Sequence, residues 1–351
     1  MSMDSYLVTG AAGFIGRSIA AELLARGMTV RGIDNLVTGK RENLRGLEGM
    51  QFIEADLNDP EATTEACRDV ECIFHEAALP SVPRSIEDPI ASNHACVSAT
   101  VQLLHSAKAA GVKRVVYAGS SSVYGNTSTL PKREDMLPTP ISPYAVGKLA
   151  GELYMRSFTQ VYGLETVILR YFNVFGPYQD PTSPYSGVLA KFTLKMLAGE
   201  CPTVCGDGGQ SRDFTFIENV VQGNLLAAES PAPLVSGKVF NIATGISVTL
   251  NETVNILRNI TSYSGEVNYA AERSGDVKHS LADITLAREC LGYTPRVHFR
   301  EGLQRTVAWH KTMFSGEPVQ TRAADRPILS LRPVQSPNPN SRTRVSGTLD
   351  L

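Results

Sequence analysis

The stretch Gly10-Ala11-Ala12-Gly13-Phe14-Ile15-Gly16 decides the fold of this chain. It follows an apolar run, Tyr6–Thr9, and opens a segment, Phe14–Arg26, whose apolar residues recur at helical spacing. A strand, a glycine-rich turn and a helix in this order are typical of the first unit of a dinucleotide-binding sheet.

Each glycine of this turn has a physical task. Gly10 permits the tight turn, Gly13 lets the backbone approach a pyrophosphate, and Gly16 lets the helix pack closely on the strand. The helix that opens with Phe14 and Ile15 directs its first N–H groups at the pyrophosphate charge. The turn therefore predicts a dinucleotide site.

Asp34 ends the next apolar run and would accept a hydrogen bond from a ribose hydroxyl. A phosphate at that position would face the carboxylate charge, so the sequence favours NAD over NADP. Arg31, Lys40 and Arg41 lie nearby and keep NADP open as an alternative.

The alternation of short apolar runs and amphipathic stretches continues through the first half of the chain. It predicts strands at Thr29–Ile33, Gln51–Ala55, Cys72–His75, Val115–Ala118 and Thr166–Leu169, and helices at Asn93–Ala110 and Ser142–Tyr162. Since these strands are apolar enough to be covered on both faces, we expect an α/β fold with a Rossmann-type, doubly wound parallel sheet.

After Arg170 the alternation of apolar runs and amphipathic stretches is no longer regular. Helices are predicted at Val188–Ala198, Glu218–Glu229, Leu250–Asn259, Ala282–Leu291 and Arg300–Phe314, with short strands between them such as Val239–Ile242 and Val267–Tyr269. We expect three parts: a dinucleotide-binding domain over residues 1–175, a smaller α/β substrate lobe over 176–314 that exchanges some strands or helices with it, and a disordered tail over 315–351.

Composition narrows the function. The chain has 351 residues, with 33 Lys and Arg against 35 Asp and Glu, and this near-zero net charge excludes a long nucleic-acid tract. The six cysteines form no CxxC pair, so we expect no metal site and a reducing, cytoplasmic location with free thiols. Neither a signal peptide nor an apolar run of membrane length is visible, so no membrane partner is expected.

A candidate catalytic group follows from residue spacing. Tyr144 and Lys148 are four apart in the helical stretch after Pro143, so they share a helix face. A lysine ammonium and a positive nicotinamide ring would lower the pKa of the tyrosine and let it act as a base near neutrality. Ser120 follows a predicted strand, where α/β sheets place ligand-contacting groups. Such Tyr/Lys pairs also arise by chance on helix surfaces, but the dinucleotide turn favours catalysis here.

Nine stretches, in order along the chain, resemble the extended short-chain dehydrogenase/reductases and, within them, the nucleotide-sugar epimerase branch. They are GAAGFIG, IDNL with TGKRENL, Asp56-Leu57, HEAA, AGSSSVYG, SPYAVGK, RYFNVFGP, SRDFTFIENV and RSGDVKHSLAD. The resemblance implies that Asn35 of IDNL contacts the cofactor and that Asp56 and Leu57 lie near adenine. It also implies that Ala77 and Ala78 line the cofactor and that Tyr144 and Lys148 reach the nicotinamide ribose.

The residues after Ser120 separate the reactions within this family. Related sugar 4,6-dehydratases carry Asp-Glu in the two following positions, and related uronate decarboxylases carry Glu in the second. Ser121 and Ser122 stand there in this chain, and serine hydroxyls cannot supply that acid and base. The resemblance therefore implies reversible C4 epimerisation through a 4-keto sugar, with Ser121 and Ser122 as further sugar contacts.

The resemblance also implies a UDP-sugar substrate and a homodimer. Its diphosphate contacts would be Asn173, Arg212 and Arg273, and Asp276 would contact the uridine ribose. Ser280 aligns with a gate position that is Tyr in members restricted to glucose and galactose, so UDP-Glc/UDP-Gal and UDP-GlcNAc/UDP-GalNAc both stay open.

Three alternatives remain. The first is a UDP-uronate 4-epimerase, although such members carry Arg where this chain has Asp180. The second is a nucleotide-sugar ketoreductase. The third, a non-catalytic NAD-sensing protein, would be expected to lose Ser120, Tyr144 or Lys148.

Overall fold

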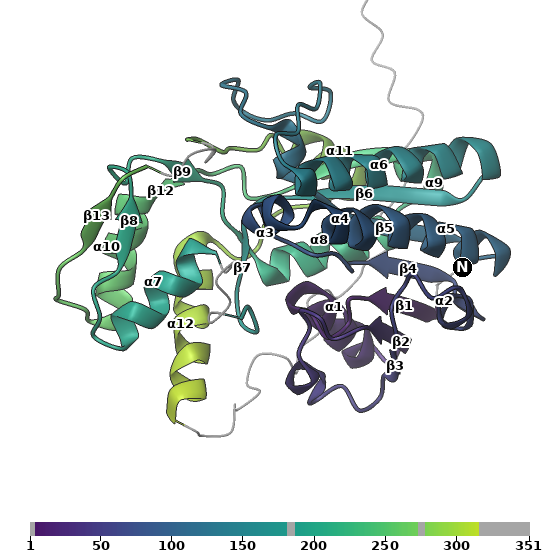
Figure 1. The fold of residues 1–351 in the computed structure, drawn as a ribbon, viewed down its shortest axis with the longest axis horizontal. Coiled ribbons are helices and arrows are strands. Elements are labelled where there is room, and N and C mark those ends of the chain that lie inside the picture. Colours follow the sequence, from purple (N-terminus) through teal and green to yellow (C-terminus); the bar gives the residue numbers. More distant parts are fainter. Residues whose placement is uncertain (1–3, 181–186, 273–277, 316–351) are drawn as a thin grey trace, which may run out of the picture.

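The computed structural model describes residues 4–180, 187–272 and 278–315. Its centre is a seven-stranded sheet in the order β11-β6-β5-β4-β1-β2-β3 (Figure 1). The strands are β1 Ser5–Thr9, β2 Thr29–Asp34, β3 Gln51–Glu54, β4 Cys72–His75, β5 Arg114–Ser120, β6 Glu165–Tyr171 and β11 Lys238–Ile242. Every pairing in this sheet is parallel, which confirms the predicted fold class.

Alternate residues of each strand enter two separate cores, as the twofold period of a strand requires. Val8 and Val116 belong to the core on one face of the sheet, and Leu7 and Val115 belong to the core on the other. All four side chains are fully buried. The continuous apolar runs of the sequence therefore exist because both faces of the sheet are covered.

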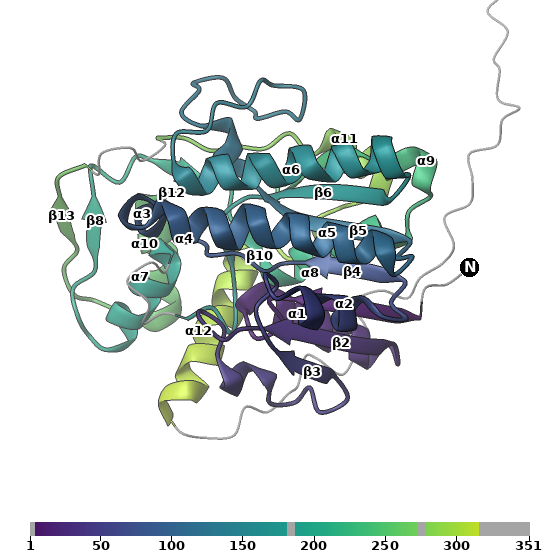
Figure 2. The same ribbon diagram turned by 45° about the vertical axis from the view of Figure 1, so that its right-hand side comes forward.

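Helices cover the two faces. One face carries α1 (Phe14–Ala25) and α8 (Ile217–Glu229), and the opposite face carries α2 (Pro60–Cys67), α5 (Ala99–Ala109) and α6 (Pro143–Tyr162). Figure 2 shows α5 and α6 running side by side across the sheet. Around this layer lie α3 (Val82–Glu87), α4 (Pro89–Asn93), α9 (Ala232–Val235) and α11 (Thr285–Leu291).

Short single turns complete the first half of the chain. Two are 3-10 turns, η1 (Arg41–Leu44) and η3 (Ser121–Tyr124), and one is a π turn, η2 (His94–Ser98). The helix predicted at Asn93–Ala110 is therefore interrupted: α4 ends at Asn93, the π turn follows, and α5 begins at Ala99.

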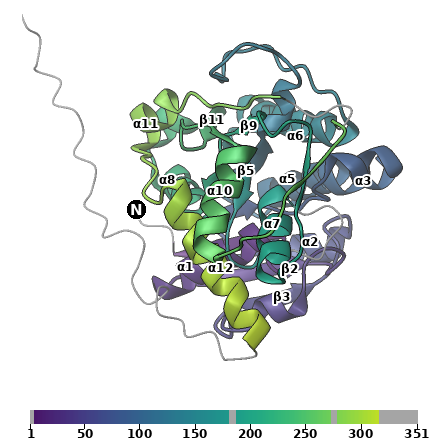
Figure 3. The same cartoon turned by 90° about the vertical axis from the view of Figure 1, so that its left-hand side faces the viewer.

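A smaller lobe extends beyond one end of the sheet (Figure 1), and Figure 3 shows the molecule from the side of this lobe. It holds α7 (Val188–Leu197), α10 (Leu250–Thr261) and α12 (Phe299–Ser315), and α10 packs against both other helices. Its strands form three pairs: β7 Val174–Phe175 with β10 Thr215–Phe216, β9 Ser211–Arg212 with β12 Val248–Thr249, and β8 Thr203–Cys205 with β13 Asn268–Ala270.

The chain crosses between the lobes more than once. β11 pairs with β6 and forms one edge of the sheet, and α8 packs on β5 and β6, although both β11 and α8 follow residue 175. The domain limits at 175 and 314 stay predictions, and the tail predicted over 315–351 lies outside the described residues apart from its first residue.

Within the described residues no helix is long and apolar enough to cross a membrane. The six cysteines, all of which are described, form no disulfide. No group of three or more His, Cys, Asp and Glu side chains in the described ranges could hold a metal ion.

Candidate active site

A cleft of about 2450 Å³ opens at the carboxyl ends of the parallel strands and is closed on its other side by the small lobe. The residues that follow β1, β2, β3, β4 and β6 contribute to its wall, and so do Ala118 and Gly119 near the end of β5. Each predicted cofactor residue lines it: Gly10, Gly13, Phe14, Ile15, Gly16, Asp34, Asn35, Asp56, Leu57, Ala77, Ala78, Tyr144 and Lys148.

The glycine turn is too tight for any side chain at two positions. Gly10 has φ +66°, and a Cβ added there would lie 2.9 Å from the Ala77 backbone nitrogen. A Cβ on Gly16 would lie 2.2 Å from the Gly10 carbonyl oxygen. Gly13 caps α1 without a side-chain hydrogen bond, so the first N–H groups of the helix are left to a ligand. This cradle fits a dinucleotide pyrophosphate.

Asp34 is held in place by backbone donors. Its Oδ2 accepts from the Ala12 N–H at 3.0 Å, and its Oδ1 accepts from the Leu36 N–H at 2.8 Å. Burial raises the pKa of this carboxyl, and these two hydrogen bonds oppose the shift. Each oxygen has a further lone pair, so the carboxylate can also receive ribose hydroxyls.

The next strand ends supply a second polar pair. The Asn35 amide donates to Asp56 Oδ2 at 2.7 Å, which ties the loop after β2 to the loop after β3. Both residues line the same part of the cleft as Asp34.

Tyr144 and Lys148 lie on the first turns of α6, whose start is fixed by Ser142: its side chain accepts from the Ala145 N–H. Lys148 is buried, and its Nζ donates to the Ala118 carbonyl at 2.8 Å. Tyr144 is half-buried and shares a hydrogen bond with the Ser120 side chain. Two elements, β5 and α6, thus bring the three predicted catalytic residues together.

Burial raises the pKa of Tyr144, and the Ser120 hydrogen bond is the contact that lowers it. The sequence analysis assigns the lower pKa to Lys148 together with a nicotinamide ring, and that expectation stays a prediction.

Ser122, in the serine run at the end of β5, forms two hydrogen bonds with Ser120. The Ser122 hydroxyl donates to Ser120 Oγ at 2.8 Å, and the Ser122 N–H donates to the same atom at 3.2 Å. Since Ser120 Oγ accepts twice, its own proton is available to the Tyr144 oxygen. Ser122 therefore supports Ser120, and Ser121 opens the 3-10 turn η3.

Three predicted substrate residues lie close together outside the lining of the cofactor cleft. The Asn173 amide donates to the Asp213 carbonyl at 3.0 Å, next to Arg212 in β9. The Ser280 N–H donates to the Ser211 carbonyl at 3.0 Å. Arg273 and Asp276 lie outside the described residues.

Asp213 organises this region and was missed from the sequence. Its Oδ1 accepts from both the N–H and the hydroxyl of Thr244, and its Oδ2 accepts from Gly245 and Ala282. The side chain is fully buried. Its place in the SRDFTF stretch was visible, but its partners follow it by some 30 and 70 positions and could not be read from spacing.

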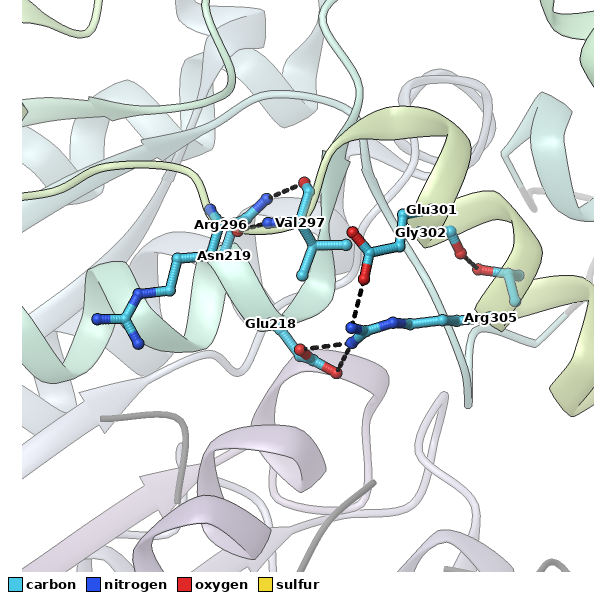
Figure 4. Close-up of polar contacts among 8 residues, drawn as sticks. Glu218, Asn219, Arg296, Val297, Glu301, Gly302 and Arg305 are labelled. Atoms are coloured by element: carbon cyan, nitrogen blue, oxygen red, sulfur yellow. Dashed lines mark hydrogen bonds and ion pairs between the residues drawn. The ribbon is translucent and has the colours of Figure 1, made fainter. Parts of the chain in front are cut away.

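Figure 4 shows how α12 is fixed to the start of α8. The Asn219 amide donates to the Val297 carbonyl at 2.8 Å, and its oxygen accepts from the Arg296 and Val297 N–H groups at 2.8 and 3.0 Å. Arg305 of α12 forms two 2.9 Å contacts with Glu218. These residues form one wall of the cleft.

Residues 177–180 line the cleft near the glycine turn. The Arg17 guanidinium of α1 lies 3.5 Å from the Tyr178 ring centroid, and Tyr178 lies 5.2 Å from the Trp309 ring. Lys40 Nζ and Asp180 Oδ2 form an ion pair at 2.8 Å. These contacts join the cofactor side to the small lobe.

The sequence of this chain was compared with those of known proteins. The model of the NAD dependent epimerase/dehydratase family matches residues 6–243. A UDP-glucose 4-epimerase of Mycolicibacterium smegmatis is 39% identical over 87% of this chain and 98% of its own.

Two solved structures share the fold. The UDP-N-acetylglucosamine 4-epimerase from Methanobrevibacter ruminantium, in complex with UDP-N-acetylmuramic acid, has a TM-score of 0.84 and 40% identity, covering 89% of this chain and all of its own. The UDP-glucuronic acid 4-epimerase from Bacillus cereus, in complex with UDP-glucuronic acid and NAD, has a TM-score of 0.81 and 33% identity, covering 88% and 99%.

Proposed function

The chain belongs to the NAD dependent epimerase/dehydratase family, and from this premise we propose that it is an NAD-dependent UDP-sugar 4-epimerase. The reaction is the reversible inversion of C4 of a UDP-hexose through a 4-keto sugar. The observation that carries the proposal is the meeting of Ser120, Tyr144 and Lys148 beside a cleft shaped for a dinucleotide.

The side chains have distinct tasks in this reaction. NAD, when bound, supplies a hydride acceptor and donor, and the protein orients it. Tyr144 takes the proton of the sugar 4-hydroxyl and later returns it, while Ser120 forms a hydrogen bond with the oxygen of that hydroxyl. Lys148, anchored on the Ala118 carbonyl, keeps a positive charge next to the phenolate. Ser122 fixes the Ser120 rotamer.

The two parts of the molecule divide the ligands. We assign the NAD contacts to residues 1–175 and the substrate contacts mainly to 176–314, where Arg212, Arg273 and Asp276 reach the nucleotide diphosphate and ribose. Asn173, near the end of the first part, joins them on the diphosphate. This assignment is supported by the Asn173 amide, which donates to the backbone carbonyl of Asp213, the residue directly after Arg212.

The sugar is a hexose that is acetylated, non-acetylated or both. Ser280 is small and partly buried, which leaves room for a 2-acetamido group but does not reject the smaller sugar. Asp180 carries a negative charge held by Lys40, which disfavours a uronate carboxylate.

The working form is a homodimer. Val146, Leu153 and Val161 of α6 are spaced at about two helical turns and are all exposed. Ile86 and Ile90, from the neighbouring α3 and α4, are exposed beside them. A contiguous apolar face of this kind is typical of an interface between copies.

The cytoplasm is the compartment that the thiols favour. The six cysteines are free, which suits a reducing environment.

The test is turnover without added reductant. We expect the enzyme with NAD to convert UDP-Glc or UDP-GlcNAc to the 4-epimer, measured by chromatography, and Tyr144→Phe to abolish turnover while still binding NAD. UDP-glucuronate is the comparison substrate. No 4-epimer from any of these sugars, or full activity of Tyr144→Phe, would refute the proposal.

A further inference from the structure

Glu76 is a carboxylic acid in the wall of the cleft for which the proposed reaction has no task. It follows β4, in the turn next to the glycine cradle: a Cβ on Gly10 would come within 3.1 Å of the Glu76 carbonyl carbon. Its Oε2 is buried and has no hydrogen-bond partner in the described structure. A buried carboxylate oxygen left in this way needs a reason, because it costs desolvation.

The other oxygen of Glu76 is fixed by a chain of hydrogen bonds. The Asn224 amide of α8 uses its two hydrogens on the Val220 carbonyl, at 2.9 Å, and on the Tyr171 hydroxyl, at 2.8 Å. The single hydroxyl proton of Tyr171 has two acceptors in reach, Glu76 Oε1 at 2.8 Å and Asn224 Oδ1 at 3.0 Å. Because the Asn224 amide already donates to this hydroxyl, we assign the proton to the shorter contact with Glu76. Three elements, β4, β6 and α8, thus hold one carboxyl in one orientation.

Lys148 is the cation next to Glu76. His75 pairs with Tyr117 in the parallel register of β4 and β5, so Glu76 follows beside Ala118, whose carbonyl accepts from Lys148 Nζ. The two groups interact electrostatically, and the other titratable groups around them are Cys96 of η2, Tyr144 of α6, Tyr117 of β5 and Tyr171 of β6. His75, on the same strand as Glu76, bonds Thr9 and Thr100 through its two nitrogens, and burial lowers its pKa to about 3, so it stays neutral.

The second carboxylate near Lys148 is already engaged. Glu152 receives two hydrogen bonds from Arg170, at 3.0 and 2.8 Å, and both side chains are buried. Its charge is therefore balanced by Arg170. Among the carboxylates that act on Lys148, Glu76 is the one that no cation pairs with in the described residues.

We propose that Glu76 is a positioning residue of this site, whose carboxylate balances the Lys148 ammonium and sets the pH range in which Tyr144 and Lys148 work. The inference rests on the proposed function for its kinetic test only. A negative charge raises the pKa of both neighbours. Removing it lowers both: Tyr144 loses its proton at lower pH, and Lys148 loses its charge at lower pH.

The charge of Glu76 itself changes near neutrality. Burial raises its pKa to about 7, and the Tyr171 hydrogen bond opposes this. Below that pH Glu76 is neutral, and above it the carboxylate supports Lys148. Tyr171→Phe removes the donor, so it keeps Glu76 neutral over a wider pH range.

The experiment compares Glu76→Gln with Glu229→Gln, a control at the far end of α8, where a partly exposed carboxylate pairs with Arg26. We expect both limbs of the kcat/KM profile to move to lower pH in Glu76→Gln, by roughly one pH unit. Tyr171→Phe should move them less in the same direction, and should add nothing to Glu76→Gln. The Glu229→Gln profile should match the wild type.

Two measurements do not need turnover. Infrared difference titration should show one carboxyl of the wild type and of Glu229→Gln titrating near pH 7, and this signal should vanish in Glu76→Gln. Ultraviolet difference titration against Tyr144→Phe should show the Tyr144 phenolate forming at lower pH in Glu76→Gln. Both titrations can be read even if no UDP-sugar is epimerised. The proposed role of Glu76 and the proposed epimerase function can therefore be refuted independently of each other. An unchanged Tyr144 titration in Glu76→Gln, or full additivity with Tyr171→Phe, would overturn the inference.

Discussion

The Arg17 guanidinium lies 3.5 Å from the centre of the Tyr178 ring, so the helix that follows the glycine turn is joined directly to a segment of the small lobe. Both residues line the cofactor cleft. Tyr178 has φ +68°, a conformation that costs a non-glycine residue energy and that the surrounding contacts must therefore stabilise. This contact is a candidate for holding NAD in place between turnovers.

Tyr178→Ala should release NAD faster. Loss of a cation–π contact of about 1–2 kcal/mol corresponds to a roughly five- to thirtyfold faster dissociation. Trp309, the one tryptophan of the chain, lies 5.2 Å from Tyr178 and reports the release by fluorescence. Tyr178→Phe keeps the ring but loses the hydroxyl that Arg17 also contacts, so it should release NAD more slowly than Tyr178→Ala. Equal release rates for the Ala and Phe variants would contradict this role.

Asp34→Asn should weaken the preference for NAD over NADP by roughly tenfold, since the carboxylate charge that repels a 2′-phosphate is lost. The amide keeps the size of the side chain and one of the two acceptors that hold the Ala12 and Leu36 N–H groups, so the loop after β2 should loosen for both cofactors alike. Dissociation constants for the two cofactors, measured by titration calorimetry, give the ratio. Asp135→Asn, at an exposed surface pair, is the control. A ratio unchanged from the wild type would rule out Asp34 as the ribose ligand.

Glu152→Gln should lower the free energy of unfolding by about 3–5 kcal/mol, because it leaves the Arg170 charge buried without its partner. Each side chain of this pair is only 3% exposed. Asp135→Asn breaks the exposed pair with Arg133 and should change stability by less than about 1 kcal/mol. Urea unfolding of the two variants at neutral pH makes the comparison. Similar losses in both variants would show that the buried pair has no special weight.

Ser280→Tyr should separate the two classes of sugar. A bulky side chain at the gate position fills the space of an acetamido group, so kcat/KM for UDP-GlcNAc should fall roughly tenfold or more while UDP-Glc turnover persists. Ser280→Ala keeps the space and should retain both activities. A parallel loss for both sugars in Ser280→Tyr would show that residue 280 does not gate the sugar.

The central strands could be predicted from their apolar runs, but their ends could not. β5 begins at Arg114, one residue before the predicted strand, because this buried guanidinium donates to the Ala227, Ala228 and Ser230 carbonyls at the end of α8. A charged residue at a strand start looks like a loop in the sequence. Only the folded chain shows that distant carbonyls satisfy it.

Some helices and helix starts were predicted wrongly for similar reasons. α2 was not predicted, since its residues are mixed in polarity; it forms because Asp59 caps it and Pro60 opens it. The helix predicted from Ala282 begins at Thr285, because Ala282 pairs as a β-bridge with Lys132.

The site divides in the same way. The glycine turn and the Tyr144–Lys148 spacing are local patterns, and spacing along one element predicts them. Glu76, Tyr171 and Asn224 come from β4, β6 and α8, and their contact exists only once the sheet has formed. Sequence reasoning finds residues that share a turn or a helix, and it misses networks that the tertiary fold assembles.

The fate of a deuterium label at C4 tests the central claim most directly. A UDP-hexose deuterated at C4 is incubated with the NAD-loaded enzyme in ordinary water, and the 4-epimer is analysed by NMR. We predict that the epimer retains the deuterium at C4, because the hydrogen leaves and returns within one closed site. An epimer that carries solvent hydrogen at C4, or no epimer at all, would contradict the account.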